Sequence, residues 1–540
     1  MNTKKSFLIA SLLGLSMGAQ AQTLEDGIKM VQYERYQTAQ KILEPLATGN
    51  ARANYYLGLS QLANEQKDAA RATFSKFPED PANIAGLARV LFAEGKTTEG
   101  TAKALEAAAK AKKKDWEPQK FAADALSADG GNPTIAIEYY TKAMEKAPEN
   151  TGLKIAFADA SQKLDNGGGK AMSSYQSVMQ KDPKNSLAYS RMGALWYAAR
   201  NYDSALVNYA RAKDSDPNNP LPYRDLANAY FLVGKYELAK QNSDQYLKLS
   251  DGSTEDKIQH ANLLYLAKYY PEAIKEMQDL IASGAEKPYM YRIIGYSQFE
   301  TNDYTNALTN MDNFFAKQDP KKILPSDYMY YGKILSLNGK VEEADTYFNK
   351  AIAADSSSNK SELYRKIAEG FIAQKNEVAY AKAGEWYGKI VAENPGTKAI
   401  DYFNWGLYRY YGKKYEDAAN AFAAMHTKYP EQPSAIYWQG RVAAAIDNEG
   451  KGGLALPYFN EWLNIADTKD YTKKPADLNK AYQYLALYYY NKGDKAQTVV
   501  YMNKIATIDP NDAFVKQLNS ILNPSKKPAS PAPKPAAKGK

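Results

Sequence analysis

Two columns of side chains repeat along this chain, and their types are suited to holding another molecule. Arg224 and Asn228 lie four residues apart, so they share one face of a helix. Asparagine amides can hydrogen-bond a peptide backbone, and aromatic rings can cover apolar side chains. The polar column contains Arg224, Asn228, Asn262 and Arg292. The aromatic column has members 34 residues apart: Tyr197, Phe231, Tyr265 and Phe299.

Groups that could carry catalysis are few. The chain has no Cys and only 2 His among its 540 residues. The absence of Cys removes thiolate nucleophiles and thiolate metal ligands. Carboxylates are scattered over the expected helix faces, and the glycine-rich stretch at 166–174 lacks residues that a phosphate loop requires. We therefore expect no enzyme, no bound metal and no cofactor.

A second set of columns, made of small residues, shows which elements must carry these side chains. Small residues at matching places on two helices allow close antiparallel packing across a short turn. Proline then ends the second helix, as at Pro217. The first column, at intervals of 34, is Gly193, Ala227, Ala261 and Gly295. The second, 12 residues later, is Ala205, Ala239, Ala273 and Ala307.

One unit, residues 186–219, carries a nearly complete motif. Its motif residues are Tyr189, Met192, Gly193, Trp196, Ala205, Tyr209, Ala212 and Pro217. This pattern resembles the tetratricopeptide repeat (TPR) family. The resemblance implies an all-α fold, a right-handed α-solenoid of antiparallel helix pairs (a TPR superhelix) with a concave groove lined by first helices. We expect about thirteen helix pairs over residues 22–515.

The resemblance also assigns places in the groove. Some TPR proteins grip the C-terminal carboxylate of a peptide with Lys, Asn and Arg side chains on successive first helices. Arg224, Asn228, Asn262 and Arg292 resemble that clamp, whereas Tyr296 stands where the clamp has Arg. The predicted peptide-binding residues are Arg224, Asn228, Asn262, Arg292, Tyr296, Tyr197, Phe231, Tyr265 and Phe299. The alternative is that the aromatic column packs helices together and the polar column is a solvated face.

The two ends of the chain differ from its body. Residues 1–21 have two lysines, a short apolar run and Ala-Gln-Ala, the pattern of a signal peptide. We expect an exported chain, periplasmic or extracellular, with outer-membrane association left open, and no transmembrane segment. Residues 516–540 should hold a helix end and a disordered Pro/Ala/Lys-rich tail. That tail could contact anionic envelope polymers weakly, or it could simply be solvated.

The charge of the body argues against nucleic acid as a partner. The net charge of the whole chain is +8. Without the two lysines of 1–21 and the five of 521–540, 62 basic and 61 acidic residues remain. A nucleic-acid surface needs an excess of basic residues on the folded part.

The sequence thus predicts a non-enzymatic scaffold or adaptor of the bacterial cell envelope. It would bind proteins or peptides in the groove of a TPR superhelix. A periplasmic protein that binds glycans or cell-wall fragments is the alternative, because the 44 Tyr residues would permit stacking on sugars.

Overall fold

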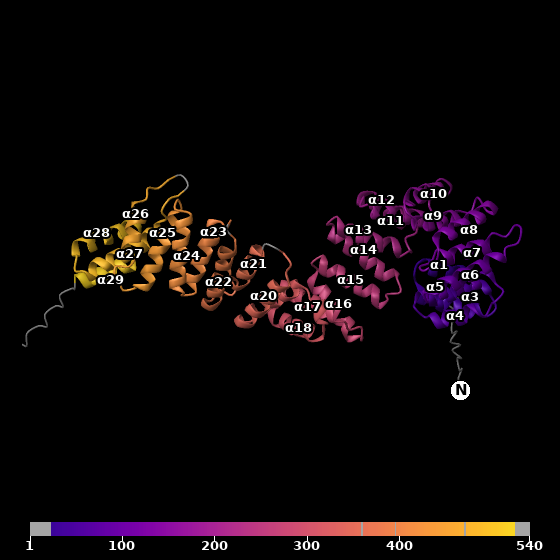
Figure 1. Cartoon of the computed structure of the whole chain (residues 1–540), viewed down its shortest axis with the longest axis horizontal. Coiled ribbons are helices and arrows are strands. Elements are labelled where there is room, and N and C mark those ends of the chain that lie inside the picture. Colours follow the sequence, from indigo (N-terminus) through magenta and orange to yellow (C-terminus); the bar gives the residue numbers. More distant parts are fainter. Residues whose placement is uncertain (1–22, 358–359, 395, 469–470, 524–540) are drawn as a thin grey trace, which may run out of the picture. The chain divides into compact units, whose positions relative to one another are not determined.

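The structure, a computed structural model, describes residues 23–357, 360–394, 396–468 and 471–523. The expected signal peptide at 1–21 and the expected tail beyond residue 523 lie outside these ranges. Within them the regular structure is 29 α-helices and one 3-10 turn, without strands, so the predicted all-α fold is confirmed (Figure 1). None of the described helices combines the length and the apolar character needed to span a membrane.

The chain divides into two compact units, Met1–Glu286 and Lys287–Lys540. The helices of unit 1 are α1 (Leu24–Gln32), α2 (Tyr36–Ala47), α3 (Ala51–Ala63), α4 (Lys67–Phe74), α5 (Pro81–Ala93), α6 (Thr97–Ala109), α7 (Glu117–Leu126), α8 (Pro133–Lys146), α9 (Thr151–Gln162), α10 (Gly168–Lys181), α11 (Ser186–Ala198), α12 (Tyr202–Ser215), α13 (Leu221–Leu232), α14 (Tyr236–Leu249), α15 (Thr254–Leu266) and α16 (Tyr270–Ala282).

Unit 2 is also a series of consecutive helices. Its elements are α17 (Pro288–Glu300), α18 (Tyr304–Lys317), the 3-10 turn η1 (Pro320–Lys322), α19 (Pro325–Leu337), α20 (Val341–Ala354), α21 (Ser361–Ile372), α22 (Glu377–Glu393), α23 (Ala399–Tyr411), α24 (Tyr415–Lys428), α25 (Pro433–Ile446), α26 (Leu456–Asn464), α27 (Pro475–Asn491), α28 (Lys495–Ile508) and α29 (Ala513–Leu522).

Consecutive helices pack as antiparallel pairs. Over the described residues, α1 to α28 form fourteen pairs, each odd-numbered helix with the next, and α29 follows alone. In every pair except α25–α26, the turn has one residue in the left-handed region, such as Arg200 (φ 60) between α11 and α12 or Gly234 (φ 74) between α13 and α14. The next N–H then bonds back into the first helix, as Asn201 does to the Trp196 carbonyl at 2.9 Å. The chain therefore reverses within a few residues.

The column of small residues has a direct packing role. A Cβ atom added to Gly193 would lie 2.6 Å from Cδ1 of Tyr209 on the partner helix. In unit 2, a Cβ on Gly332 would lie 2.6 Å from Cε1 of Phe348. A large side chain on the second helix thus fills the space that the glycine leaves on the first. This complementarity fixes the distance between the two helices of a pair.

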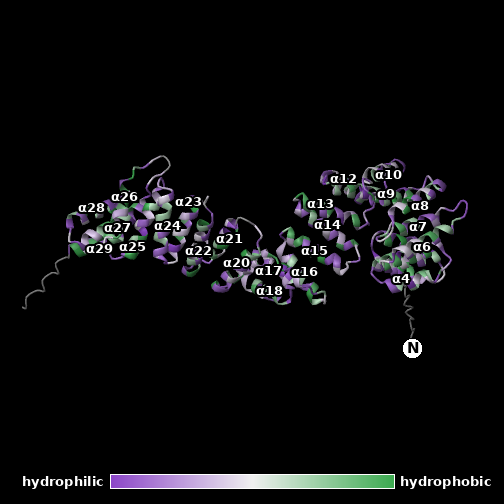
Figure 2. Cartoon of the chain, viewed as in Figure 1, coloured by the Kyte–Doolittle hydropathy of each residue, from purple (hydrophilic) through white to green (hydrophobic). Residues whose placement is uncertain are grey.

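Burial is distributed along the array. Figure 2 shows hydrophobic and hydrophilic residues interleaved along the helices of each unit. A typical core cluster joins neighbouring pairs: Tyr175 and Val178 of α10 are buried with Ala188 of α11. Each pair therefore depends on its neighbour to cover its apolar face, as expected for a repeat solenoid.

Candidate functional site

The aromatic column packs within its own helix pairs. In unit 1, Tyr197 meets Tyr202 with ring centroids 5.6 Å apart, and Phe231 meets Tyr236 at 5.5 Å. The same relation joins Tyr265 to Tyr270 at 6.2 Å in unit 1, and Phe299 to Tyr304 at 5.8 Å in unit 2. Each contact spans the turn between a first helix and its second helix. The four column rings are only half-buried, so they support the turn and still present surface.

The side-chain amides of the two predicted asparagines of unit 1 are available to form hydrogen bonds. Asn228 on α13 is exposed and Asn262 on α15 is half-buried. Each follows the small residue of its repeat, Ala227 or Ala261, so the two occupy equivalent places on neighbouring first helices. Among the residues that the structure describes, neither amide has a hydrogen-bond partner. An amide that is free to donate and accept is what recognition of a peptide backbone requires.

Arg224, in contrast, already binds a carboxylate of its own chain. Its Nη1 lies 2.7 Å from Oε2 of Glu34, and its Nε lies 3.6 Å from Oδ1 of the adjacent Asp225. Burial lowers the pKa of Arg224, but the charges of Glu34 and Asp225 outweigh that effect and raise it overall. Burial raises the pKa of Asp225 to about 6. A carboxylate ligand at Arg224 would therefore compete with Glu34.

Glu34 belongs to a contact that closes unit 1 on itself. The turn between α1 and α2 meets loops that lie 183 to 216 residues later in the sequence. The Tyr33 hydroxyl donates to Asp216 Oδ2 at 2.5 Å. Asp251 Oδ2 accepts the backbone N–H groups of Gln37 at 2.8 Å and of Thr38 at 3.1 Å. We call this set of contacts the N-terminal closure.

A hollow of about 240 Å³ lies beside the N-terminal closure. Its lining includes Arg224 and four acidic residues, Glu34, Asp251, Glu255 and Asp256. Because acidic groups outnumber the single guanidinium, the hollow offers little attraction for an anion. Sequence comparison between repeats did not reveal the N-terminal closure, since repeat patterns report contacts between neighbouring units only.

Two predicted residues of unit 2, Arg292 and Tyr296, contact the buried side chain of Asp327. The Tyr296 hydroxyl donates to Asp327 Oδ1 at 2.6 Å, and the Tyr296 ring stacks on Tyr330 with centroids 3.8 Å apart. Tyr296 is 7% exposed and Asp327 is fully buried. Arg292 Nη1 lies 3.6 Å from Asp327 Oδ2, and its guanidinium lies over Phe314. Burial and the Asp327 charge hold the pKa of Tyr296 well above its usual range. These contacts join α17 to α19 and leave little of Tyr296 accessible.

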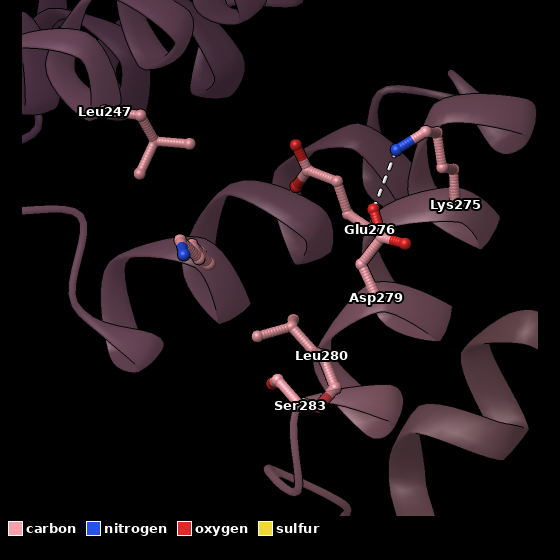
Figure 3. A pocket seen from close by; sticks show the side chains of 7 residues that line it. Leu247, Lys275, Glu276, Asp279, Leu280 and Ser283 are labelled. Atoms are coloured by element: carbon pink, nitrogen blue, oxygen red, sulfur yellow. Dashed lines mark hydrogen bonds and ion pairs between the residues drawn. The ribbon is translucent and has the colours of Figure 1, made fainter.

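Figure 3 shows a hollow of about 300 Å³ between α14, α15 and α16 of unit 1. One lysine of its lining is paired with an acid: Lys275 Nζ lies 2.7 Å from Asp279 Oδ2. Glu276, on the same wall, is 2.7 Å from Nδ1 of His260, whose Nε2 is 2.8 Å from Asp244 Oδ1. His260 is buried at 6% exposure, so this histidine connects three helices. Both acidic residues of the lining, Glu276 and Asp279, are therefore already paired with basic side chains of the same unit.

A further cationic hollow, which the sequence reading did not identify, lies in unit 2. It measures about 340 Å³ and is lined by residues of α23, α25, α26, α27 and α29, with Arg441 and Lys480 as its cations. The position of these lining residues within their repeats could have been recognised from the sequence. Arg441 directly follows the small residue Gly440, as Asn228 follows Ala227. Gln483 precedes the small residue Ala486 by three positions, as Arg224 precedes Ala227.

Comparison with known proteins gives the following matches. Residues 52–80 match the family model of the tetratricopeptide repeat. A search of curated protein sequences found no match. The C-terminal part of a TPR repeat-containing protein from Cytophaga hutchinsonii is similar, with 26% identity over 48% of this chain and 98% of that chain, at a TM-score of 0.35. A tetratricopeptide repeat protein from Parabacteroides merdae has 20% identity over 47% of this chain and 98% of that chain, at a TM-score of 0.32. The structure of the APC/C hetero-tetramer Cut9–Hcn1 has 13% identity over 91% of this chain and 94% of that chain, at a TM-score of 0.30.

Proposed function

We propose that this chain, which is a tetratricopeptide-repeat protein, acts as a non-enzymatic adaptor that binds extended segments of other proteins along the first helices of unit 1. The observation that carries the proposal is the pair of free amides on Asn228 and Asn262, at equivalent places of neighbouring repeats. Two amides in this arrangement can each hold one peptide group of an extended segment. The half-buried rings of Phe231 and Tyr265 lie one helical turn further along the same helices and could cover the side chains of that segment.

The proposed location is the bacterial cell envelope. Its support is the signal-peptide pattern of residues 1–21 and the lack of Cys, which suits an exported chain. Scaffold proteins of this kind would work by holding partners together, so no catalytic group is required.

Site-specific photo-cross-linking in intact cells tests the proposal. A photoreactive amino acid is placed at position 228, and a matched control places it at Val207, an exposed residue on the second helix α12. We expect adducts at position 228 whose partner peptides map to one extended segment, and few adducts at position 207. The Asn228→Ala/Asn262→Ala double variant should remove the same partner while circular dichroism shows unchanged helicity.

Equal adducts at both positions, or retention of the partner by the double variant, would contradict the proposal. A peptidoglycan pull-down run in parallel addresses the glycan alternative. Binding of peptidoglycan fragments that the double variant loses, without a protein adduct at 228, would favour that alternative.

A further inference from the structure

A hollow of about 530 Å³ in unit 1 is lined by α2 and by the turn that joins α3 to α4. All of its lining side chains are polar, and four of the six are carboxamides. They are Gln37, Gln40, Lys41, Glu44, Asn64 and Gln66. Across the described part of the chain, none of these six side chains forms a hydrogen bond or an ion pair. The hollow therefore presents several donors and acceptors that are available to a ligand.

Gln40 adds a polar atom that is both buried and unpaired. Its Nε2 is shielded from solvent and has no hydrogen-bond acceptor among the described residues. Buried polar groups in native proteins nearly always have a partner, so an unpaired one calls for an explanation. A hydroxyl oxygen of a ligand in the hollow would supply the acceptor that Gln40 Nε2 lacks.

Gln37 and Asn64 also line the smaller hollow of about 240 Å³ beside the N-terminal closure, so the two hollows share a wall. The smaller hollow adds an aromatic ring, since Tyr36 is half-buried in its lining. The N-terminal closure holds this wall in place, because the Gln37 backbone N–H donates to Asp251 Oδ2 at 2.8 Å. Residues from two distant parts of the chain thus form one elongated site.

The charges of this site disfavour an anion. In the larger hollow Lys41 and Glu44 have opposite charges, so its lining has no net charge. In the smaller hollow the carboxylates of Glu34 and Asp251 are each paired with an arginine of unit 1. Glu255 and its acidic neighbour at 256 make the rest of that lining negative. A ligand that fills both hollows should therefore be polar and carry no negative charge.

A sugar ring has the groups that this lining requires. Each sugar hydroxyl both donates and accepts a hydrogen bond, as the carboxamides of the lining do together. The C–H face of a sugar ring can pack against an aromatic side chain such as Tyr36. An apolar amino-acid side chain, in contrast, would meet only polar side chains in the larger hollow. Volumes of about 530 and 240 Å³ suit a ligand of a few rings.

We propose that the two hollows bind neighbouring rings of a neutral glycan, with sugar hydroxyls at Gln40, Asn64 and Gln66 and one ring against Tyr36. Asn64 contacts both rings, because it lines both hollows. The lining of neither hollow includes the two asparagines of the proposed peptide site. The glycan site is thus a second binding function of unit 1, and it does not depend on the proposed peptide-binding function.

Affinity electrophoresis of the full chain tests this assignment. Native gels contain one soluble neutral polysaccharide each, namely dextran, galactomannan, mixed-linkage β-glucan or arabinoxylan, and one further gel contains the anionic polysaccharide alginate. We expect at least one neutral polysaccharide to slow the migration of the chain relative to a gel without polysaccharide. Titration with oligosaccharides of the same polysaccharide, followed by calorimetry, then gives the dissociation constant.

Substitutions in the lining locate the binding. Gln40→Leu keeps a similar volume and removes an unpaired buried donor, so the fold should be retained, with helicity checked by circular dichroism. It should raise the dissociation constant about three- to tenfold through the loss of one hydrogen bond. Gln40→Leu/Asn64→Leu should abolish the slower migration. Gln278→Leu, at an exposed amide of α16 outside both hollows, is the matched control and should leave binding unchanged.

Normal migration in all four neutral polysaccharides would overturn the proposal, as would slower migration that Gln40→Leu/Asn64→Leu retains. Binding of a lysine-rich peptide that the same double variant loses, with normal migration in every gel, would assign the hollows to a cationic peptide and also overturn it. The Asn228→Ala/Asn262→Ala variant separates the two sites. If this variant loses its cross-linked partner and still migrates slowly, both proposals are supported; if it migrates normally, the glycan is not bound in these hollows.

Discussion

Asp251 caps the first turn of α2 by binding Thr38, although the two residues are 213 positions apart. Asp251 Oδ2 accepts the Thr38 N–H at 3.1 Å, and its Oδ1 accepts the Thr38 hydroxyl at 2.5 Å. The local N-cap position of α2 is Arg35, whose side chain makes no capping hydrogen bond. A carboxylate near a helix N-terminus also interacts favourably with the helix dipole. Asp251 therefore provides the capping side chain that the N-cap residue of α2 itself does not provide.

Removing this distant cap should loosen the first helix pair. We expect Asp251→Ala to lower the stability of α1 and α2 by about 1–2 kcal/mol, the usual cost of a lost N-cap. Hydrogen exchange measured by mass spectrometry should show faster exchange in residues 24–47 and unchanged exchange in unit 2. Asp214→Ala, at a carboxylate that is 73% exposed, is the control. Unchanged exchange in residues 24–47 would show that the N-terminal closure contributes nothing to their stability.

The glycine column should tolerate no added bulk. A Cβ atom on Gly406 would lie 2.6 Å from Cζ of Phe422, which is fully buried. We expect Gly406→Val to destabilise the α23–α24 pair by about 1–3 kcal/mol through overpacking. Hydrogen exchange across 399–428 is the measurement, and Gly49→Ala is the control, because nothing lies within 4 Å of that position. Partial rescue of Gly406→Val by Phe422→Leu would identify the overlap as the cause.

The sequence predicted the fold well because the information is local and repeated. Gly193 and Tyr209 contact each other across one turn, and an interval of 34 residues reproduces their relation along the chain. Helix pairs follow from such columns without knowledge of distant parts. The roles of the polar column were harder to predict, because residues at one position of the repeat have different roles in different repeats. Asn228 has a free amide, whereas Tyr296 at the equivalent place is buried against Asp327.

Contacts between distant repeats could not be predicted in this way. Arg224 has the same register as a clamp residue, yet Glu34, 190 positions earlier, is its partner. No periodic pattern joins these two residues, because their contact depends on the curvature accumulated over the intervening helices. The cation at Arg441 could have been found, since it follows the small residue Gly440 in the register of Asn228.

The stability of the α14–α16 region should depend on pH through His260. Burial lowers the pKa of His260, but the hydrogen bonds and charges of Glu276 and Asp244 outweigh it, so the pKa lies above its usual value of 6.5. Other charged groups face this junction: Lys240 lies 3.0 Å from Asp244, the charge of Glu272 acts on Lys240, and Lys275 interacts with the charge of Glu276. A pKa raised by folding means that the folded state holds the proton more tightly. The stabilisation is therefore complete below pH 6.5 and is lost as pH rises through the pKa of the folded state.

Comparison of the wild-type chain with His260→Gln measures this contribution. The difference in hydrogen-exchange protection over residues 236–282 should be largest at acidic pH and should shrink steadily as pH rises above 6.5. An NMR titration of the His260 ring gives the pKa directly, with His426→Gln used to assign the signals of the two histidines. A His260 pKa below 6.5, or a protection difference that grows with pH, would show that burial outweighs the two carboxylates.

The aromatic column can be tested for packing and for binding separately, with Tyr197 and Tyr202. The two rings are in edge-to-face contact with centroids 5.6 Å apart. If this contact stabilises the turn, the variants Tyr197→Leu, Tyr202→Leu and their combination should give a coupling energy of about 0.5–1.5 kcal/mol in a double-mutant cycle. Because only Tyr197 belongs to the predicted binding column, Tyr197→Leu should weaken the partner cross-linked at position 228 more than Tyr202→Leu does. A measurable coupling energy with equal partner binding by both variants would assign the column to packing alone.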